Sequence, residues 1–349
     1  MFKRSFVVSL LFILALLAAA CGAPAPAATP APVTEAAVEE AATEAPTAEA
    51  AFPVSIEHKY GSTTIEAAPE RIVLVGLNEQ DALLALGVVP VATREWYGER
   101  PGAIFEWAQD ELAALDGATP VVLSSGQLNF EEIAALEPDV IVGLYAGITQ
   151  EEYTTLSQIA PTVAQPAEYV DWGVPWQEVT RTMGQIVGKA AEAENLIAGV
   201  ESAFAEARAQ FPNIQGAEAV VATPWGYPTS YYVYGSQDSR GRFMTSLGFS
   251  YPPVIDELAG EEFGASISLE RFDIIDIDFL IWIDSLPEEM RNNPLYANLD
   301  IVKDGRVVYL SNTSPIYDAL NFSTVLSIPF AIEQLSPDFA QLNQTLQTP

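Results

Sequence analysis

The chain has 349 residues, 49% of them apolar, so it is long enough to bury one or two hydrophobic cores. Its 15 Lys and Arg stand against 47 Asp and Glu, which gives a formal charge of −32. This balance excludes nucleic acid as a partner, because few cations are left to displace counterions from phosphates.

Residues 1–21 are typical of an export signal. Lys3 and Arg4 precede an apolar run and three small residues that end at Cys21, the only cysteine. The segment LAAAC resembles a bacterial lipobox, which implies acylation of Cys21 and a lipid anchor on the outer face of a membrane. The alternative is a plain secretory signal that is cut near the same alanines. Neither case leaves cysteines for an internal disulfide.

Residues 22–51 are rich in Ala, Pro, Thr and Glu and offer almost nothing to bury. This composition predicts a disordered tether between the anchor and a folded body.

A first α/β lobe is predicted over residues 52–175. It begins with a β-hairpin that turns at Tyr60 and Gly61. Strands and short helices then alternate, which predicts a mostly parallel, doubly wound sheet. The expected strands lie at 72–75, 88–93, 121–124, 140–142 and 162–163, and the expected helices at 79–86, 130–136 and 151–159.

Residues 176–211 carry a helical pattern that predicts a connector to a second lobe, residues 212–349. An unbroken helix of this length would span about 54 Å, and Gly184 and Gly188 are the positions at which it would divide in two. Strands of the second lobe are expected at 219–222, 232–234, 279–283 and 307–309. The predicted fold class is therefore α/β, with two doubly wound lobes joined by a long helix.

The sequence contains an internal repeat. The segment NFEEIAALEPDVIVG at 129–143 returns as SLERFDIIDIDFLIW at 268–282. Acidic residues occupy matching places in the two copies: Glu131 with Glu270, and Asp139 with Asp278. Each copy predicts a short helix with its Glu in the first turn behind a polar cap, followed by a buried strand. The alternative is that any two amphipathic helix-strand units look alike.

Taken in order, six blocks of the chain resemble the siderophore-binding proteins of ABC importers. These blocks are PERIVLVGLNEQDALLALGVVPVAT, LNFEEIAALEPDVIVG, LSQIAPTV, YVYGSQDSRGRFMTSLGF, SLERFDIIDIDFLIWID and NPLYANLDIVKDGRVVYL. The resemblance implies a monomer that holds a ferric siderophore in a shallow cleft between its lobes. It also implies delivery to a permease dimer with its ATPase, and iron bound only within the chelate, with no other cofactor. Cobalamin and haem binders share this architecture, so those ligands are the alternative.

The resemblance gives the paired glutamates a role. It implies that Glu131 and Glu270 each meet Arg residues of one permease subunit. Two like charges on two lobes suit a two-fold symmetric partner. The alternative is simple compensation of a helix dipole.

Loops that follow strands are expected to line the cleft. The predicted ligand contacts are Arg94, Trp96, Tyr97, Tyr145, Trp225, Tyr227, Tyr231, Arg240, Phe263 and Tyr317. The resemblance matches Arg240 to an Arg of catecholate-binding relatives and Phe263 to an aromatic residue of hydroxamate-binding relatives. Ser125 stands where some hydroxamate binders carry Arg. Two of the 15 basic residues lie in the export signal, which leaves 13, so a neutral or weakly charged chelate is favoured.

Other chemistries find less support in the sequence. Direct metal capture would depend on His58 alone, the single histidine. The chain has no G-x-S-x-G elbow and no phosphate-binding loop after an expected strand. An extracellular hydrolase built on a carboxylate pair is the enzyme alternative. The sequence therefore predicts a binding protein without catalytic residues and without a metal site of its own.

Overall fold

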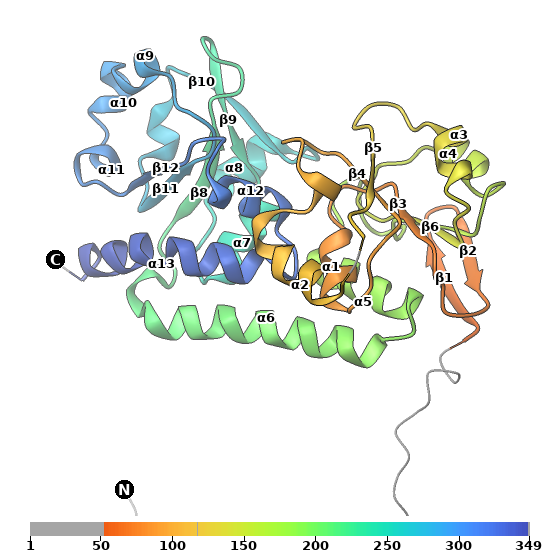
Figure 1. Ribbon diagram of the computed structural model, residues 1–349. Coiled ribbons are helices and arrows are strands. Elements are labelled where there is room, and N and C mark those ends of the chain that lie inside the picture. The colour runs from red at the N-terminus through yellow and green to blue at the C-terminus, as the bar shows by residue number, and fades with distance from the viewer. Residues whose placement is uncertain (1–51, 117, 348–349) are drawn as a thin grey trace, which may run out of the picture. The chain divides into compact units, whose positions relative to one another are not determined.

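The computed structural model describes residues 52–116 and 118–347 (Figure 1). The predicted export signal, Cys21 and the predicted tether lie outside these residues. Within the described part, no helix has both the length and the apolar character needed to cross a membrane.

The first sheet has five parallel strands in the order β5-β4-β3-β6-β7. Its strands are β3 (Ile72–Leu74), β4 (Ala92–Arg94), β5 (Val121–Leu123), β6 (Val140–Gly143) and β7 (Thr162–Ala164). Every residue of β3, β6 and β7 is buried, as expected for strands covered by helices on both faces. The predicted parallel sheet is confirmed here, and we call the region around it the first lobe.

Short helices connect the strands of the first lobe. They are α1 (Gln80–Ala85), α2 (Gln109–Ala114), α3 (Phe130–Ala135) and α4 (Gln150–Leu156), with 3₁₀ turns η2 (Pro101–Ala103) and η3 (Glu106–Ala108). The predicted hairpin is confirmed as β1 (Val54–His58), which pairs antiparallel with β2 (Gly61–Ile65).

The second sheet also has five strands, in the order β10-β9-β8-β11-β12, but it is mixed. Its strands are β8 (Ala219–Thr223), β9 (Ser230–Tyr234), β10 (Gly264–Ser268), β11 (Phe279–Trp282) and β12 (Val307–Tyr309). β8, β11 and β12 are parallel, whereas β9 is antiparallel to both of its neighbours. The sequence prediction missed β10 and this reversal. Residues 224–229 are too few for a helical crossover, so β9 must turn back along β8.

The region around the second sheet, the second lobe, carries the remaining helices. They are η4 (Pro212–Ile214), α7 (Ser239–Ser246), α8 (Pro253–Ala259), η5 (Phe272–Ile275), α9 (Glu288–Arg291), α10 (Pro294–Ala297), α11 (Asp300–Lys303), α12 (Pro315–Phe322) and α13 (Ser327–Thr345).

The predicted connector is divided into two helices. It consists of α5 (Trp176–Ile186) and α6 (Ala190–Gln210), which are separated by a turn at Gly188 with φ +71°. Gly184 does not break α5; a Cβ there would lie 2.4 Å from the Cβ of Ala193, so glycine lets α5 pack on α6. The 21 residues of α6 span only about 31 Å, and this helix runs along both lobes (Figure 1).

One continuous hydrophobic core joins the two lobes. It includes Leu74 of β3, Met183 of α5, Phe204 of α6, Val221 of β8 and Phe339 of α13. Each five-stranded sheet also has a smaller core of its own, on the face turned away from the shared core. Separating the lobes would expose apolar surface, which favours a stiff joint between them. The boundaries at 175 and 211 stay a prediction.

The repeat has a structural basis in its aspartates. The carboxylate of Asp139, just before β6, accepts hydrogen bonds from the backbone N–H groups of Glu70 (2.8 Å) and Arg71 (2.9 Å), which lead into β3. Asp278, just before β11, accepts one from the N–H of Glu218 (2.9 Å), which leads into β8. Each aspartate thus fixes the start of the neighbouring parallel strand.

The glutamates of the repeat differ in their local structure. Glu131 lies in the first turn of α3, and the side chain of Asn129 caps that helix by accepting from the N–H of Glu132 (3.2 Å). The predicted helical position of Glu270 is wrong, because η5 begins only at Phe272. Ser268 still pairs with β9, so a helix cannot start directly behind it.

Candidate functional site: an aromatic cleft between the lobes

A cleft of about 450 Å³ lies between the two lobes, and we call it the inter-lobe cleft. Its volume falls in the range of small-molecule sites. Most of its residues follow strands of the two sheets, where open α/β sheets place their ligands. The cleft is lined by Leu77, Arg94, Glu95, Trp96, Ser125, Tyr145, Ala146, Trp172, Trp225, Tyr232, Tyr234, Asp238, Arg240 and Phe263.

Six of the predicted ligand contacts meet in the inter-lobe cleft: Arg94, Trp96, Tyr145, Trp225, Arg240 and Phe263. Both lobes contribute aromatic side chains to it. The part that each side chain plays in ligand binding stays a prediction.

The other four predicted contacts lie outside the cleft lining. Tyr231 is fully buried in the second lobe, where its ring stacks on Phe272 at 5.1 Å between centroids. Because side chains alternate along a strand, Tyr232 and Tyr234 face the cleft instead. Tyr227 is exposed on the turn between β8 and β9.

Tyr97 and Tyr317 belong to the joint between the lobes. Their rings lie 6.0 Å apart, edge to face, and Tyr97 also packs against Trp96 and Phe322. Burial, together with the nearby carboxylate of Asp318, raises the pKa of Tyr97, so this phenol stays protonated.

Several lining residues escaped the sequence analysis: Leu77, Glu95, Ala146, Trp172, Tyr232, Tyr234 and Asp238. Trp172 had the clearest signal, since it is an aromatic residue in the loop after β7. Its backbone is left-handed, with φ +56°, and its indole lies against Gly147. A Cβ at Gly147 would come within 2.7 Å of that ring, so the glycine makes room for the tryptophan.

Arg240 is held by an ion pair inside the cleft. Its Nε and Nη2 donate to the two carboxylate oxygens of Asp238, each at 2.7 Å. Its guanidinium also lies over the ring of Tyr234, 3.8 Å from the centroid. Burial acts to lower the pKa of Arg240, but the charge and hydrogen bonds of Asp238, together with the nearby phenols of Tyr234 and Tyr145, raise the pKa above its ordinary value. The charge of Arg240 is thus balanced before any ligand arrives.

Arg94 has a different environment. Its guanidinium donates to the backbone carbonyls of Val75 (3.1 Å), Ser125 (3.4 Å) and Gly126 (2.8 Å). No carboxylate among the described residues lies within ion-pair distance of it. Burial lowers its pKa from the ordinary value, and its Nε is enclosed without a hydrogen-bond partner. Arg94 is therefore the cation of the cleft that a ligand oxygen could engage.

A buried glutamate supports the first-lobe wall of the cleft. Glu79 accepts hydrogen bonds from the backbone N–H groups of Tyr145 (2.8 Å) and Asn78 (3.1 Å), and it ties the loop after β3 to the loop after β6. Gly76 leaves space for this carboxylate, since a Cβ would lie 1.7 Å from its Oε1. Burial raises the pKa of Glu79 and raises the pKa of Tyr145 to about 12. The sequence predicted Glu79 only as the start of a helix.

Metal-binding side chains do not gather in the described residues: no group of three or more His, Cys, Asp or Glu is placed to hold an ion. His58 is buried in the hairpin, where its Nε2 and the hydroxyl of Thr63 are hydrogen-bonded at 2.9 Å.

The family of the chain follows from comparison with known sequences. Residues 72–313 match the model described as periplasmic binding protein, a span that contains both five-stranded sheets and begins after the N-terminal hairpin. The chain belongs to the periplasmic binding protein family. In this member of the family, a helix runs along two lobes, each with its own five-stranded sheet, and the cleft lies between the lobes.

Relatives of this binding protein are known in several bacteria. It is 26% identical over 259 residues to the Fe(3+)-citrate-binding protein YfmC of Bacillus subtilis, covering 72% of this chain and 76% of the relative. A solved periplasmic solute binding protein of Mycobacterium smegmatis is 33% identical, with a TM-score of 0.72 over 83% of this chain and 98% of that one. PiaA of Streptococcus pneumoniae TIGR4, solved in complex with ferrichrome, is 26% identical, with a TM-score of 0.73 over 84% and 99%. These relatives are described as binding proteins.

Both repeat glutamates lie on the surface of the binding protein. Glu131 on α3 and Glu270 before η5 are exposed, one on each lobe. Neither forms an ion pair with another described residue. Their carboxylates are therefore open to an external partner.

Proposed function

We propose that this protein captures a ferric siderophore in the inter-lobe cleft and delivers it to an ABC permease. The observation that carries the proposal is the cleft itself, in which aromatic faces from both lobes surround a small set of charged groups. Trp96, Trp225 and Phe263 offer flat apolar faces to the body of a chelator. Arg94 offers N–H donors to its metal-binding oxygens.

The charges of the cleft favour a neutral or weakly charged chelate. Its lining has two cations, Arg94 and Arg240, and two carboxylates, Glu95 and Asp238. Since Asp238 already pairs with Arg240, a strongly anionic ligand would find one open cation in a protein of charge −32. Ferric hydroxamates fit this balance best. The relatives described as binding ferrichrome and ferric citrate support a ferric chelate in general.

Delivery would use the two exposed glutamates. Glu131 and Glu270 stand on different lobes, so each can meet one subunit of a permease dimer that works with its ATPase. No bond of the ligand is made or broken by the protein in this proposal, which makes it a receptor rather than an enzyme.

We also propose that the protein acts outside the cytoplasm on a lipid anchor at Cys21. The export signal that ends at this cysteine supports the proposal. A Cys21→Ala variant should move from the membrane fraction to the soluble fraction of cells. An unchanged membrane fraction would refute the anchor.

Intrinsic tryptophan fluorescence tests the proposed ligand directly. Three of the six tryptophans, Trp96, Trp172 and Trp225, line the cleft, so a bound ferric chelate should quench them. The titration compares a ferric hydroxamate, a ferric catecholate, ferric citrate, cobalamin and haem. We expect saturable quenching at one ligand per chain, tightest for the hydroxamate. Tight binding of cobalamin or haem alone, or turnover of a chromogenic ester, would contradict the proposal.

A further inference from the structure

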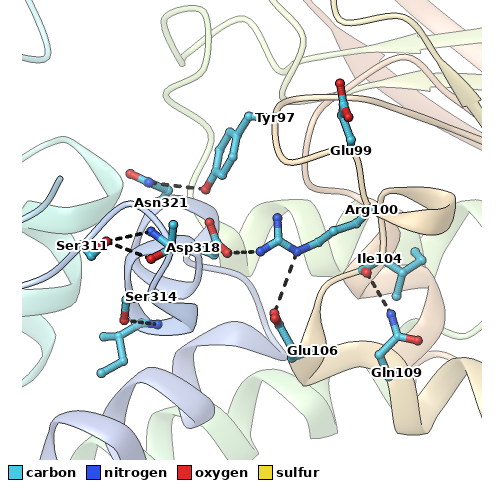
Figure 2. A network of polar contacts seen from close by, with 12 residues as sticks. Tyr97, Glu99, Arg100, Ile104, Glu106, Gln109, Ser311, Ser314, Asp318 and Asn321 are labelled. Atoms are coloured by element: carbon cyan, nitrogen blue, oxygen red, sulfur yellow. Dashed lines mark hydrogen bonds and ion pairs between the residues drawn. The ribbon is translucent and has the colours of Figure 1, made fainter. Parts of the chain in front are cut away.

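The joint between the lobes contains polar contacts made by one face of α12. Asp318 and Asn321, three residues apart on this helix, point toward the first lobe (Figure 2). A carboxylate oxygen of Asp318 lies 2.5 Å from Nη2 of Arg100. The Nδ2 of Asn321 donates to the hydroxyl of Tyr97 at 3.3 Å. Both contacts join the helix after the second sheet to the segment that follows β4.

Asn321 has a second partner on the other side. Its Oδ1 accepts a hydrogen bond from Nη1 of Arg240 at 2.5 Å. Arginine carries donors only, so the amide oxygen must face Arg240 and the amide NH₂ is left for the hydroxyl of Tyr97. Asn321 is 4% exposed and does not line the cleft. One buried amide therefore spans from the second-lobe wall to the first lobe.

The first-lobe end of this bridge also reaches the cleft. Tyr97 packs edge to face on Trp96, with 5.3 Å between ring centroids, and Trp96 lines the cleft. The chain of contacts from Arg240 through Asn321 and Tyr97 to Trp96 thus connects the two walls behind the ligand space. Burial of these groups makes their hydrogen bonds costly to leave unmade.

We propose that Asn321 is a positioning residue that fixes the spacing of the cleft walls before the ligand binds. It touches no ligand and acts through Arg240 and Tyr97. The proposal rests on the proposed function for the identity of the ligand, but not for the mechanical role. When the bridge is lost, a smaller fraction of molecules has the binding-competent spacing. The apparent affinity then falls in proportion to the fraction that remains competent.

Apolar contacts lie beside this bridge. Phe322, the next residue on α12, packs on Phe105 at 4.4 Å and on Trp96 at 5.2 Å between ring centroids. These apolar contacts stay when the amide is removed. An Asn321→Ala variant should therefore fold, with a joint that is looser at its polar end.

Four variants of the full chain test the role by ligand binding. We expect Asn321→Ala to raise the dissociation constant of the ferric hydroxamate about tenfold, and Tyr97→Phe about threefold. The double variant should be no weaker than Asn321→Ala alone, because both changes break one bridge. Ser314→Ala is the matched control, since Ser314 caps α12 by accepting from the N–H of Ile316, and among the described residues its side chain has no hydrogen bond to the first lobe.

Ser314→Ala should lower the thermal midpoint by about 2–4 °C and leave the dissociation constant within twofold. If Asn321 only stabilised the fold, then Asn321→Ala and Ser314→Ala would lose the same affinity whenever they lose the same stability. That result would overturn the proposal.

Amide hydrogen exchange of the ligand-free protein tests the role without any chelate. In Asn321→Ala, segments 95–100 and 238–243 should exchange about tenfold faster than in the wild type, and in Ser314→Ala they should not. Unchanged exchange in both segments would overturn the positioning role. If the wild type binds no ferric chelate, the proposed function fails, while this exchange result still decides the role of Asn321.

Discussion

Arg94 is the residue that should distinguish ligands by charge. It is the lining cation without a carboxylate partner among the described residues, and its guanidinium donates to three backbone carbonyls. We expect Arg94→Gln to weaken binding of an anionic chelate such as ferric citrate about tenfold, and binding of a neutral ferric hydroxamate less than threefold. Titration calorimetry with both chelates measures the difference.

Arg94→Lys is the matched control for this prediction. Both variants lose the guanidinium fork, but only glutamine loses the positive charge. The lysine variant should keep more affinity for the anionic chelate. Equal losses for both chelates in Arg94→Gln would show that Arg94 acts through the loop carbonyls and not through its charge.

Asp81 should make stability depend on pH. It is buried, and its Oδ2 accepts from the indole N–H of Trp107 at 2.7 Å and from the hydroxyl of Thr324. Burial raises its pKa from 3.8 to about 6. Because the folded state binds this proton more tightly than the unfolded state, the stabilisation is present at low pH and is lost as pH rises through about 6.

Urea unfolding at two pH values measures this effect. The wild type should lose about 1 kcal/mol of unfolding free energy from pH 5 to pH 7 through Asp81. Asp81→Asn keeps an acceptor oxygen for Trp107 and Thr324 but does not titrate. Its unfolding free energy should therefore fall by about 1 kcal/mol less than that of the wild type between pH 5 and pH 7. Glu79 and Asp318, whose pKa values burial also raises, would keep part of the slope in the variant. Identical slopes would contradict the assignment to Asp81.

Single residues of the site were predictable where one rule decided their place. Arg94 is the last residue of β4 and Trp96 lies two residues beyond it, so the rule that ligands bind at the carboxyl ends of strands places both correctly. Tyr231 and Tyr232 are neighbours, and only the strand register decides which of them faces the cleft. That register depends on pairing with β10, which the sequence did not reveal.

At the scale of elements, the contact between α5 and α6 depends on Gly184. A Cβ at this position would lie 2.4 Å from the Cβ of Ala193 and 3.1 Å from the carbonyl oxygen of Lys189. We expect Gly184→Ala to force the helices apart and to cost about 1–3 kcal/mol in urea unfolding, despite the better helix propensity of alanine.

Gly199→Ala in α6 is the control for that substitution. A Cβ there meets nothing within 4 Å, and the residue is exposed, so the same change should stabilise the protein by about 0.5–1 kcal/mol. Equal effects of the two substitutions would mean that Gly184 is not needed for close packing.

Elements were predictable where local pattern and tertiary position agree. The apolar run at 72–75 and the helix predicted at 79–86 were found because local pattern and burial agree: β3 is fully buried, and α1 is followed by Gly87 with φ +74°, which suits a glycine after a helix end. The second copy of the repeat was predicted as a helix because of its likeness to the first. Its strand pairing at Ser268 is a long-range contact, and such contacts override a local helix signal.

At the scale of the whole molecule, the shared core and the bridging helices make the two lobes one mechanical unit. The surface carboxylates on the two lobes therefore keep a fixed spacing, as docking to a symmetric partner needs. Replacing both Glu131 and Glu270 by Ala should leave ligand affinity within twofold and abolish uptake of the labelled ferric chelate by cells. Uptake at the wild-type rate would exclude the docking role. The control is a variant in which the exposed Glu257 and Glu288 are both replaced by Ala, and it should keep uptake.

The central claim is that a ferric chelate occupies the inter-lobe cleft. Titration calorimetry of the full chain and of a Ser125→Trp variant tests it most directly, because Ser125 is exposed at the cleft wall and an indole there would fill the ligand space. The account predicts that the wild type binds one ferric hydroxamate per chain, and that Ser125→Trp has an unchanged thermal midpoint and loses at least about 100-fold in affinity. Equal affinity of the two proteins, or no binding of any ferric chelate by the wild type, would contradict it.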